Sequence, residues 1–338
     1  MFNLQKINLL VQSSVTYSVP IRLRHRILCG IQGLSLQEFS SLNANGRSLA
    51  INRKTGESRV YRAVHDKRTT PLLLKMILRL LPHRSTLFIS LDHSQFGPFC
   101  IAILAISFRK GRALPIWCQV NRSKAGLMKP LLNGLKKLSG ELPRGQKLVL
   151  VMDRWFCGVK LFEFIASHGW YFICRAKYDR RVTVPWENKS IPIGEISHTE
   201  LTIEYHKINL RMVRSDLRPG MKEQEPWFLL TNIPSELSSR TQILHRYGER
   251  FEIEESFKDM KWFQRLEWQQ IKKISVIRAL LFFVFLGWWF VWTLTVRHKE
   301  LQTRSPNPKH CLSWFKGTWE TIYRLSWPNE LRFTPLSP

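Results

Sequence analysis

The sequence predicts an α/β protein in which a mixed β-sheet is flanked by helices. Two observations lead to this prediction. From Ser85 to Ala176, short apolar runs of β type alternate with helical stretches, in the order three strands, helix, strand, helix and strand. The chain of 338 residues is also 44% hydrophobic, which is enough apolar material for a sizeable core in one large domain or two to three smaller ones.

The first predicted strand, Thr86–Asp92, is an apolar run that ends in an acid, and a later one, Lys147–Asp153, ends in the same way. The other predicted elements of this part are strands at Ala102–Phe108, Ala113–Val120 and Trp170–Ala176, helices near Lys124–Leu138 and Val159–His168, and a turn at Arg109–Arg112. Three consecutive strands followed by alternating helices and strands is the ribonuclease-H-like order. Because the first and fourth strands of that fold are neighbours, Asp92 and Asp153 should lie side by side. A turn or helix-cap role is the alternative for each of them.

The region before this core, residues 1–84, is strongly basic and predicted to be helical. Leu34–Leu42 and Arg59–Val64 look like short helices separated by a polar turn. Small helical units with a basic second helix often bind duplex DNA, so residues 1–84 form a candidate DNA-binding module in which Arg59 and Arg62 are candidate contacts. The alternative is a basic helical lid that contacts phosphates only.

After the core, residues 178–226 predict a small antiparallel β insertion. Polar and apolar residues alternate at Arg181–Val184, Leu201–His206 and Leu210–Ser215, and the chain returns to the core with Trp227–Thr231. The predicted domains are a basic helical module at 1–84, the first part of the catalytic core at 85–177, the β insertion at 178–226, the second part of the core at 227–300, and a short basic helical tail at 301–338.

The formal net charge of +27 predicts a polyanionic partner, either nucleic acid or an anionic membrane, with binding of structural RNA as an alternative.

The six cysteines are scattered without a C-x-x-C pair, which is typical of reduced core residues in a cytoplasmic protein. Residues Ala279–Val296 contain no charge and have the length of a transmembrane helix. Their position after a short basic stretch favours instead a helix buried against the sheet.

The segment Tyr247–Lys261, YGERFEIEESFKDMK, predicts a single helix. At about 100° per residue, Tyr247, Arg250, Glu254 and Lys261 would fall within roughly 60° of one another on one face. A solvated helix with ion pairs such as Arg250 with Glu254 is the simpler interpretation.

Asp92 and Asp153 favour a different interpretation of Glu254. Three carboxylates from distant segments would repel one another at one site unless a cation were bound between them. Carboxylates without a cluster of cysteines or histidines suit Mg²⁺ or Mn²⁺, and a pair of such ions can promote phosphodiester cleavage. The sequence therefore predicts a metal-dependent site that acts on phosphodiesters.

The spacing Y-x2-R-x3-E-x6-K resembles the signature of the DDE transposases of bacterial insertion sequences. Asp153 and Arg154, in VMDRWF, are similar to the second-aspartate motif of that family, and the resemblance covers about residues 85–297. It implies that Asp92, Asp153 and Glu254 are catalytic and bind two Mg²⁺ ions, for which Mn²⁺ can substitute. The DNA contacts that it implies are Tyr247, Arg250, Lys261, Arg154, Arg175, Lys177 and Trp227, the last by stacking a flipped base. A core tryptophan is the alternative for Trp227.

The resemblance further implies hydrolysis at a transposon end, possibly through a hairpin, followed by transfer of the freed 3′ end into target DNA. The implied partners are terminal inverted repeats and target DNA, bound by a homodimer on paired ends in the cytoplasm, at the nucleoid and not at a membrane. An inactive or domesticated DNA-binding derivative is the main alternative. A basic membrane protein anchored by Ala279–Val296 is another. A tyrosine recombinase is disfavoured because no set of Arg and His residues is evident around an attacking tyrosine.

Overall fold

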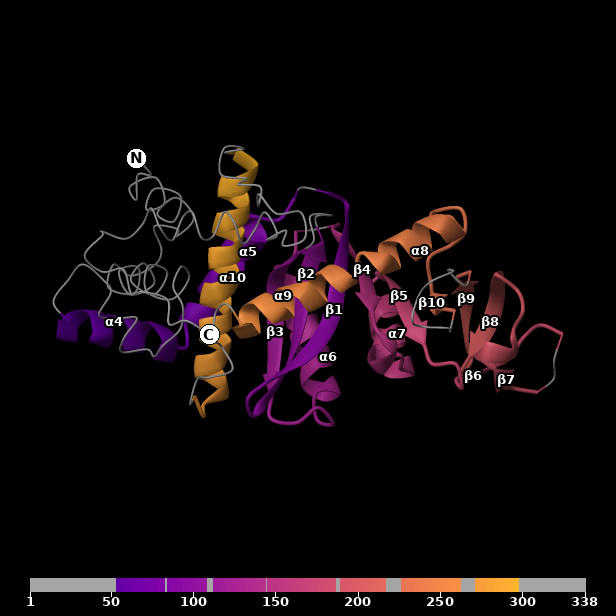
Figure 1. Cartoon of the computed structure of the whole chain (residues 1–338), viewed down its shortest axis with the longest axis horizontal. Helices are drawn as coiled ribbons and strands as arrows, with labels where there is room; N and C mark the ends of the chain where they lie inside the picture. Colours follow the sequence, from indigo (N-terminus) through magenta and orange to yellow (C-terminus); the bar gives the residue numbers. More distant parts are fainter. Residues whose placement is uncertain are drawn as a thin grey trace, which may run out of the picture.

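In the computed structural model, an eight-stranded sheet with the order β3-β2-β1-β4-β5-β10-β9-β8 runs through the molecule (Figure 1). The structure describes residues 53–82, 84–107, 112–143, 145–186, 189–216, 226–262 and 271–297. The strands of the sheet are β1 (Thr86–Phe96), β2 (Phe99–Ser107), β3 (Ala113–Asn121), β4 (Lys147–Met152), β5 (Tyr171–Ala176), β8 (Glu200–Tyr205), β9 (Ile208–Arg214) and β10 (Phe228–Thr231). A separate pair is formed by β6 (Arg181–Val182) and β7 (Ile191–Pro192).

The first five strands have the predicted ribonuclease-H-like arrangement. β1, β2 and β3 are antiparallel, whereas β4 lies parallel to β1 and β5 lies parallel to β4. The prediction that β1 ends at Asp92 is wrong, because the strand continues to Phe96 and turns into β2 through Gly97, whose φ of 53° favours glycine. The parallel pairing with β4 nevertheless stops at Leu91 and Met152. Asp92 and Asp153 are therefore the next residues along two adjacent strands.

The predicted antiparallel strands of the insertion are present, and two of them join the main sheet, whereas the one predicted at Arg181–Val184 forms β6 and pairs with β7. β8 pairs with β9, β9 pairs with β10, and β10 pairs with β5, so these strands lengthen the main sheet. The four residues of β10 are all buried. A fully buried strand needs a hydrogen-bonding partner on each side, and β5 and β9 provide them.

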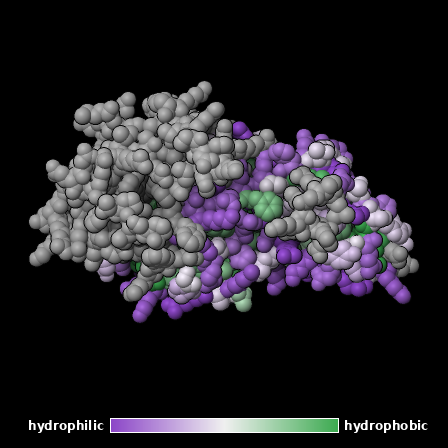
Figure 2. Space-filling model, viewed as in Figure 1, coloured by the Kyte–Doolittle hydropathy of each residue, from purple (hydrophilic) through white to green (hydrophobic). Residues whose placement is uncertain are grey.

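Helices cover both faces of the sheet (Figure 1). They are α4 (Arg53–His65), α5 (Thr69–Arg79), α6 (Met128–Glu141), α7 (Val159–Ser167), α8 (Arg240–Gly248), α9 (Phe251–Trp262) and α10 (Ile274–Arg297). Alternate residues of β4 point to opposite faces. Leu148 and Leu150 join the large core that contains α6 and α7, whereas Val149 and Val151 join a smaller core under α8. On the face seen in Figure 2, the described residues are mainly hydrophilic and apolar side chains show only in small patches.

The apolar segment Ala279–Val296 lies within α10. This helix packs against β3 on one side and against α5 and α4 on another, and all of its residues from Ala279 to Trp289 are buried. The indole nitrogen of Trp289 donates a hydrogen bond to the carbonyl of Pro115 over 2.9 Å. The prediction of a helix buried against the sheet is confirmed. Among the described residues, no helix is both long and apolar enough to cross a membrane.

The prediction of a single helix over Tyr247–Lys261 is wrong. α8 ends at Gly248 and α9 begins at Phe251, with Glu249 and Arg250 in a turn between them. Glycine disfavours the helix interior by about 1 kcal/mol relative to alanine, which makes Gly248 a suitable place for the interruption. The two helices also pack on different cores: α8 packs on the core that contains Val149, and α9 packs against strands β1, β2 and β3.

α9 is attached to the β2–β3 edge by polar side chains that do not belong to the four-residue signature. The hydroxyl of Ser256 accepts a hydrogen bond from the amide of Ala113 (3.0 Å) and lies 2.9 Å from its carbonyl. Asp259 pairs with Arg112 over 2.6 Å, and Glu252 accepts a hydrogen bond from Ser107. These contacts fix the position of the helix that carries Glu254.

We expect Ser256→Ala to lower the free energy of unfolding by about 2 kcal/mol, because it leaves the buried amide and carbonyl of Ala113 without this partner. Chemical denaturation measures the change. The matched control is Ser235→Ala, which removes an exposed hydroxyl paired only with the neighbouring Glu236 and should change stability by less than about 0.5 kcal/mol. Equal effects of the two substitutions would contradict the anchoring role of Ser256.

Candidate active site

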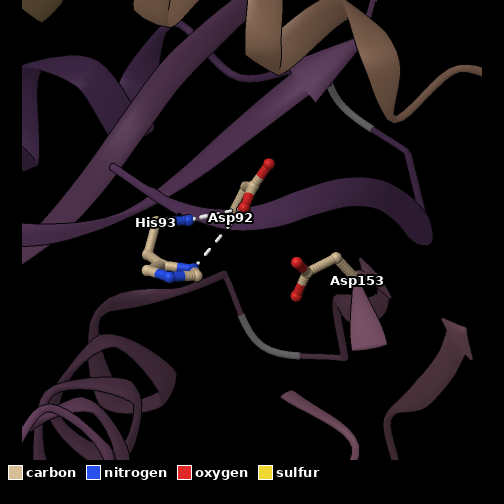
Figure 3. Close-up of side chains that lie close together, drawn as sticks. All are labelled: Asp92, His93 and Asp153. Carbon is tan, nitrogen blue, oxygen red and sulfur yellow. Dashed lines mark hydrogen bonds and ion pairs between the residues drawn. The ribbon is translucent and has the colours of Figure 1, made fainter. Parts of the chain in front are cut away.

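Asp92 and Asp153 lie close together with His93 where the parallel pairing of β1 and β4 ends (Figure 3). Each of the three residues offers one ligand atom, and these atoms all lie within 4.8 Å of one another. The Oδ1 atom of Asp153 caps the short helix η2 (Arg154–Phe156) by accepting a hydrogen bond from the amide of Trp155 over 2.9 Å. Asp153 is thus both a cap and a member of the cluster.

His93 is a member of this cluster that sequence reasoning missed. Its Nδ1 atom lies 3.7 Å from Oδ1 of Asp92, and its ring packs on Trp155 and Phe156, with centroid separations of 4.6 and 5.6 Å. Burial lowers the pKa of His93, and Lys124 lowers it further, while Asp153 opposes the change. The imidazole is therefore neutral at neutral pH. Its position directly after Asp92 was the available signal, but a single histidine does not form the kind of cluster that predicts a metal site.

Glu254 reaches the site through Arg250. Nη1 of Arg250 lies 2.9 Å from Oδ2 of Asp92, and Nη2 lies 2.6 Å from Oε1 of Glu254. Arg250 is only 5% exposed. Because one guanidinium binds both carboxylates, Asp92 and Glu254 are separated by the width of that group. The three predicted acids meet in one region, but Glu254 is not part of the 4.8 Å cluster that the described residues form.

The electrostatics of the site favour a bound cation. Burial raises the pKa of Asp92 from its usual 3.8 to about 7, and Asp153 and Glu254 add to the effect, which outweighs the attraction of Arg250. Burial also acts to lower the pKa of Arg250, but Tyr247, Asp92 and Glu254 together raise it, so the guanidinium remains charged. One arginine does not offset three neighbouring carboxylates. The carboxylate oxygens of this region suit a hard divalent ion such as Mg²⁺ or Mn²⁺.

Comparison with protein families gives a match to the transposase DDE domain over residues 102–290, which is more than half of the chain. The chain belongs to this family. The matched region contains Asp153 and Glu254 and begins after Asp92. A comparison with curated proteins found no match. The family is one of transposases, and the mixed sheet flanked by helices agrees with its ribonuclease-H-like fold.

The predicted DNA contacts of this transposase differ in how accessible they are. Arg154, directly after Asp153, and Lys177, after β5, are exposed, whereas Arg175 is half-buried on β5. Lys261 is half-buried in the last turn of α9, with its Nζ atom 5.4 Å from the centroid of the Phe96 ring. On α4, Arg62 is exposed and Arg59 is half-buried. Their roles at DNA stay predictions.

Tyr247 and Trp227 pack against each other and not into open solvent. Tyr247 is fully buried, burial raises its pKa to about 12, and its hydroxyl has no hydrogen-bond partner in the described part of the transposase. The ring of Trp227, which is half-buried, meets Tyr247 edge-on at 5.0 Å and Phe251 at 6.0 Å. In this structure, Tyr247 cannot reach DNA unless the neighbouring side chains move, and only part of the Trp227 ring is open to a base.

The raised pKa of Asp92 predicts how the transposase domain binds metal as pH changes. Below pH 7 the buried carboxyl holds a proton that a cation must displace, so the apparent affinity for Mn²⁺ should rise from pH 5.5 to pH 7 and then level off. Calorimetric titration of the metal-free protein with Mn²⁺ measures this dependence. If the affinity for Mn²⁺ is the same at pH 5.5 and at pH 7, the pKa of Asp92 is not raised to about 7.

The same pKa has a consequence for stability without metal. Between pH 4 and pH 7 the folded protein holds the proton of Asp92 and the unfolded chain does not, so stability should fall as pH rises, by up to about 1.4 kcal/mol per pH unit. The Asp92→Asn variant has no such proton and serves as the control. Its stability should lack this part of the pH dependence.

Proposed function

We propose that this protein is the transposase of an insertion sequence, which cuts the ends of its element with two Mg²⁺ or Mn²⁺ ions and joins them to target DNA. The observation that supports this proposal most directly is the proximity of Asp92 to Asp153 and, through Arg250, to Glu254, although the three acids come from distant segments of the chain. The family match supports a transposase in general.

In this proposal, Asp92, Asp153 and Glu254 hold the ions. Such ions, when bound, lower the pKa of water and stabilise the leaving oxygen of a phosphodiester. Hydrolysis adds water across the P–O3′ bond at the end of the element and leaves a 3′ hydroxyl and a 5′ phosphate. In strand transfer, that hydroxyl attacks a target phosphate and forms a new P–O bond as a target P–O3′ bond breaks. No covalent bond between protein and DNA is needed, so Tyr247 is not a nucleophile.

Arg250 has a changing role in this scheme. Its guanidinium neutralises Asp92 and Glu254 in the free protein. When cations take over these carboxylates, the guanidinium can turn to a DNA phosphate, for which its planar fork of donors is well suited. Exposed Arg154 and Lys177 would add backbone contacts on the same edge of the sheet. If cleavage passes through a hairpin, Trp227 is the aromatic side chain available to stack a flipped base.

The proposed partners are the terminal inverted repeats of the element and the target DNA, bound by a homodimer on paired ends. Binding is expected to depend on Arg59 and Arg62 of α4 as well as on the site residues. The charge of +27 supports strong and salt-dependent attraction to duplex DNA. The reaction is expected to take place in the cytoplasm, at the nucleoid.

The experiment uses the full chain and linear DNA that carries the sequences flanking its reading frame. With Mg²⁺ or Mn²⁺, we expect strand cleavage at the element boundary that leaves a free 3′ hydroxyl, resolved on a denaturing gel. Chelation of the metal should stop cleavage. DNA that is bound specifically but not cut with either metal would overturn the proposed catalysis and identify a DNA-binding derivative.

A further inference from the structure

We propose that His93 is a ligand of a divalent cation at the Asp92–Asp153 site, which gives the site a nitrogen donor and a preference for Mn²⁺ over Mg²⁺. This inference deepens the proposed function and rests on it, because it concerns the same metal site. The carboxylates of the site follow from the sequence signature, whereas a histidine ligand does not. Figure 3 shows the three side chains close together, with the amide and the ring of His93 both joined to Asp92.

The geometry of the cluster is close to that of a metal site. Ligand atoms about 2.1 Å from one ion lie about 3 Å apart when adjacent and about 4.2 Å apart when opposite. The ligand atoms of Asp92, His93 and Asp153 lie within 4.8 Å of one another. Three atoms at that separation lie at most about 2.8 Å from their common centre, so inward movements of less than about 1 Å would bring all three onto one ion.

The Nδ1 atom of His93 needs a partner that the described residues do not supply. It is buried and makes no hydrogen bond with them, and its nearest charged neighbour is Oδ1 of Asp92 at 3.7 Å, beyond hydrogen-bond distance. A buried nitrogen left without a partner costs about 1–3 kcal/mol. A cation between this nitrogen and the two carboxylates would satisfy all three groups.

The ring is also held in place, as expected of a ligand. His93 is fixed between Trp155 and Phe156, which belong to the short helix that Asp153 caps. The same η2 turn therefore positions both Asp153 and the imidazole. A role in packing alone would account for the ring contacts, but it leaves unexplained a buried Nδ1 atom without a hydrogen-bond partner among the described residues, in a ring beside two carboxylates.

A histidine ligand has a consequence for metal choice. Mg²⁺ strongly prefers oxygen donors, whereas imidazole binds transition metals more readily. Replacing His93 should therefore weaken the binding of Mn²⁺ much more than the binding of Mg²⁺. A substitution that only loosened the packing would weaken the binding of both ions to the same extent. The ratio of the two affinities therefore distinguishes a ligand role of His93 from a packing role.

The test measures metal binding to the full chain without DNA. We expect His93→Gln to weaken Mn²⁺ binding about tenfold or more, to weaken Mg²⁺ binding less, and to remove the ¹⁴N coupling of imidazole from the electron spin-echo spectrum of bound Mn²⁺. The control is His168→Gln, which changes a half-buried histidine at the end of α7 and should leave affinity and coupling unchanged.

Each outcome bears on a definite statement. If wild-type protein binds Mn²⁺ without ¹⁴N coupling, or if His93→Gln keeps the same ratio of affinities, the assignment of His93 is overturned and the carboxylate site stands. If wild-type protein binds neither ion, or if Asp153→Asn binds both as well as wild type, the metal site of the proposed function fails as well.

Discussion

Replacing Asp153 by asparagine should lower the rate of DNA cleavage by roughly a thousandfold or more while specific DNA binding persists. The change removes one carboxylate from the cluster with Asp92 and His93. It keeps the helix cap, because the amide oxygen of asparagine can still accept the hydrogen bond from the amide of Trp155. The fold should therefore survive, and the loss would be a loss of chemistry.

The experiment compares single-turnover cleavage and gel-shift binding for the wild type and for Asp153→Asn. Glu254→Gln should behave in the same way, because Glu254 is the acid that α9 brings to the site. The matched control is Glu255→Gln, which neutralises the next carboxylate along the helix, paired with Lys258, and should change cleavage by less than about threefold. Cleavage by Asp153→Asn or Glu254→Gln at the wild-type rate would refute the assignment of the site.

Arg250→Ala should destabilise the metal-free protein by about 3 kcal/mol at pH 8, because it leaves the buried carboxyl of Asp92 without its nearest positive charge. The loss should be smaller at pH 6, since the pKa of Asp92 is already about 7 and the carboxyl can take up a proton. Saturating Mg²⁺ should restore part of the stability, because a cation replaces the guanidinium. Cleavage should fall about a hundredfold or more if Arg250 also binds a phosphate.

Chemical denaturation at the two pH values, with and without Mg²⁺, measures these effects. Arg68→Ala is a suitable control, because Arg68 pairs with Asp66 at the surface and its loss should cost less than about 1 kcal/mol at either pH. If the loss of stability in Arg250→Ala depends on neither pH nor metal, Asp92 is not the group whose charge Arg250 neutralises.

The proximity of Asp92 and Asp153 could be predicted from the sequence, because each acid follows a recognisable strand and the order of the elements makes the two strands neighbours. Each acid follows an apolar run, and the order of the strands makes those runs parallel neighbours. The longer course of β1 could not be predicted in the same way. Its residues from His93 to Gln95 are polar, and only their pairing with β2 makes them part of the strand.

Features that depend on contacts between residues far apart in the chain could not be predicted from the sequence. The spacing of Tyr247, Arg250 and Glu254 is compatible with one helix, and only the separate cores under α8 and α9 show why the chain turns between them. The approach of Arg250 to Asp92 joins residues far apart in the chain, so no local pattern reports it. The same is true of the β insertion. Its strands β8 and β9 alternate as predicted, but the pairing of β9 with β10, which places them in the main sheet, is a contact between distant parts of the chain.

The position of α10 between β3 and the pair α4–α5 limits how this protein can diversify. Buried residues of that pair, among them Val60, Leu73 and Ile77, belong to the same core as Leu280 and Phe283 of α10. A segment that replaced α4 and α5 would have to bring complementary apolar side chains with it. The pair α4–α5 and the helix α10 would therefore have to change together, although they lie far apart in the sequence.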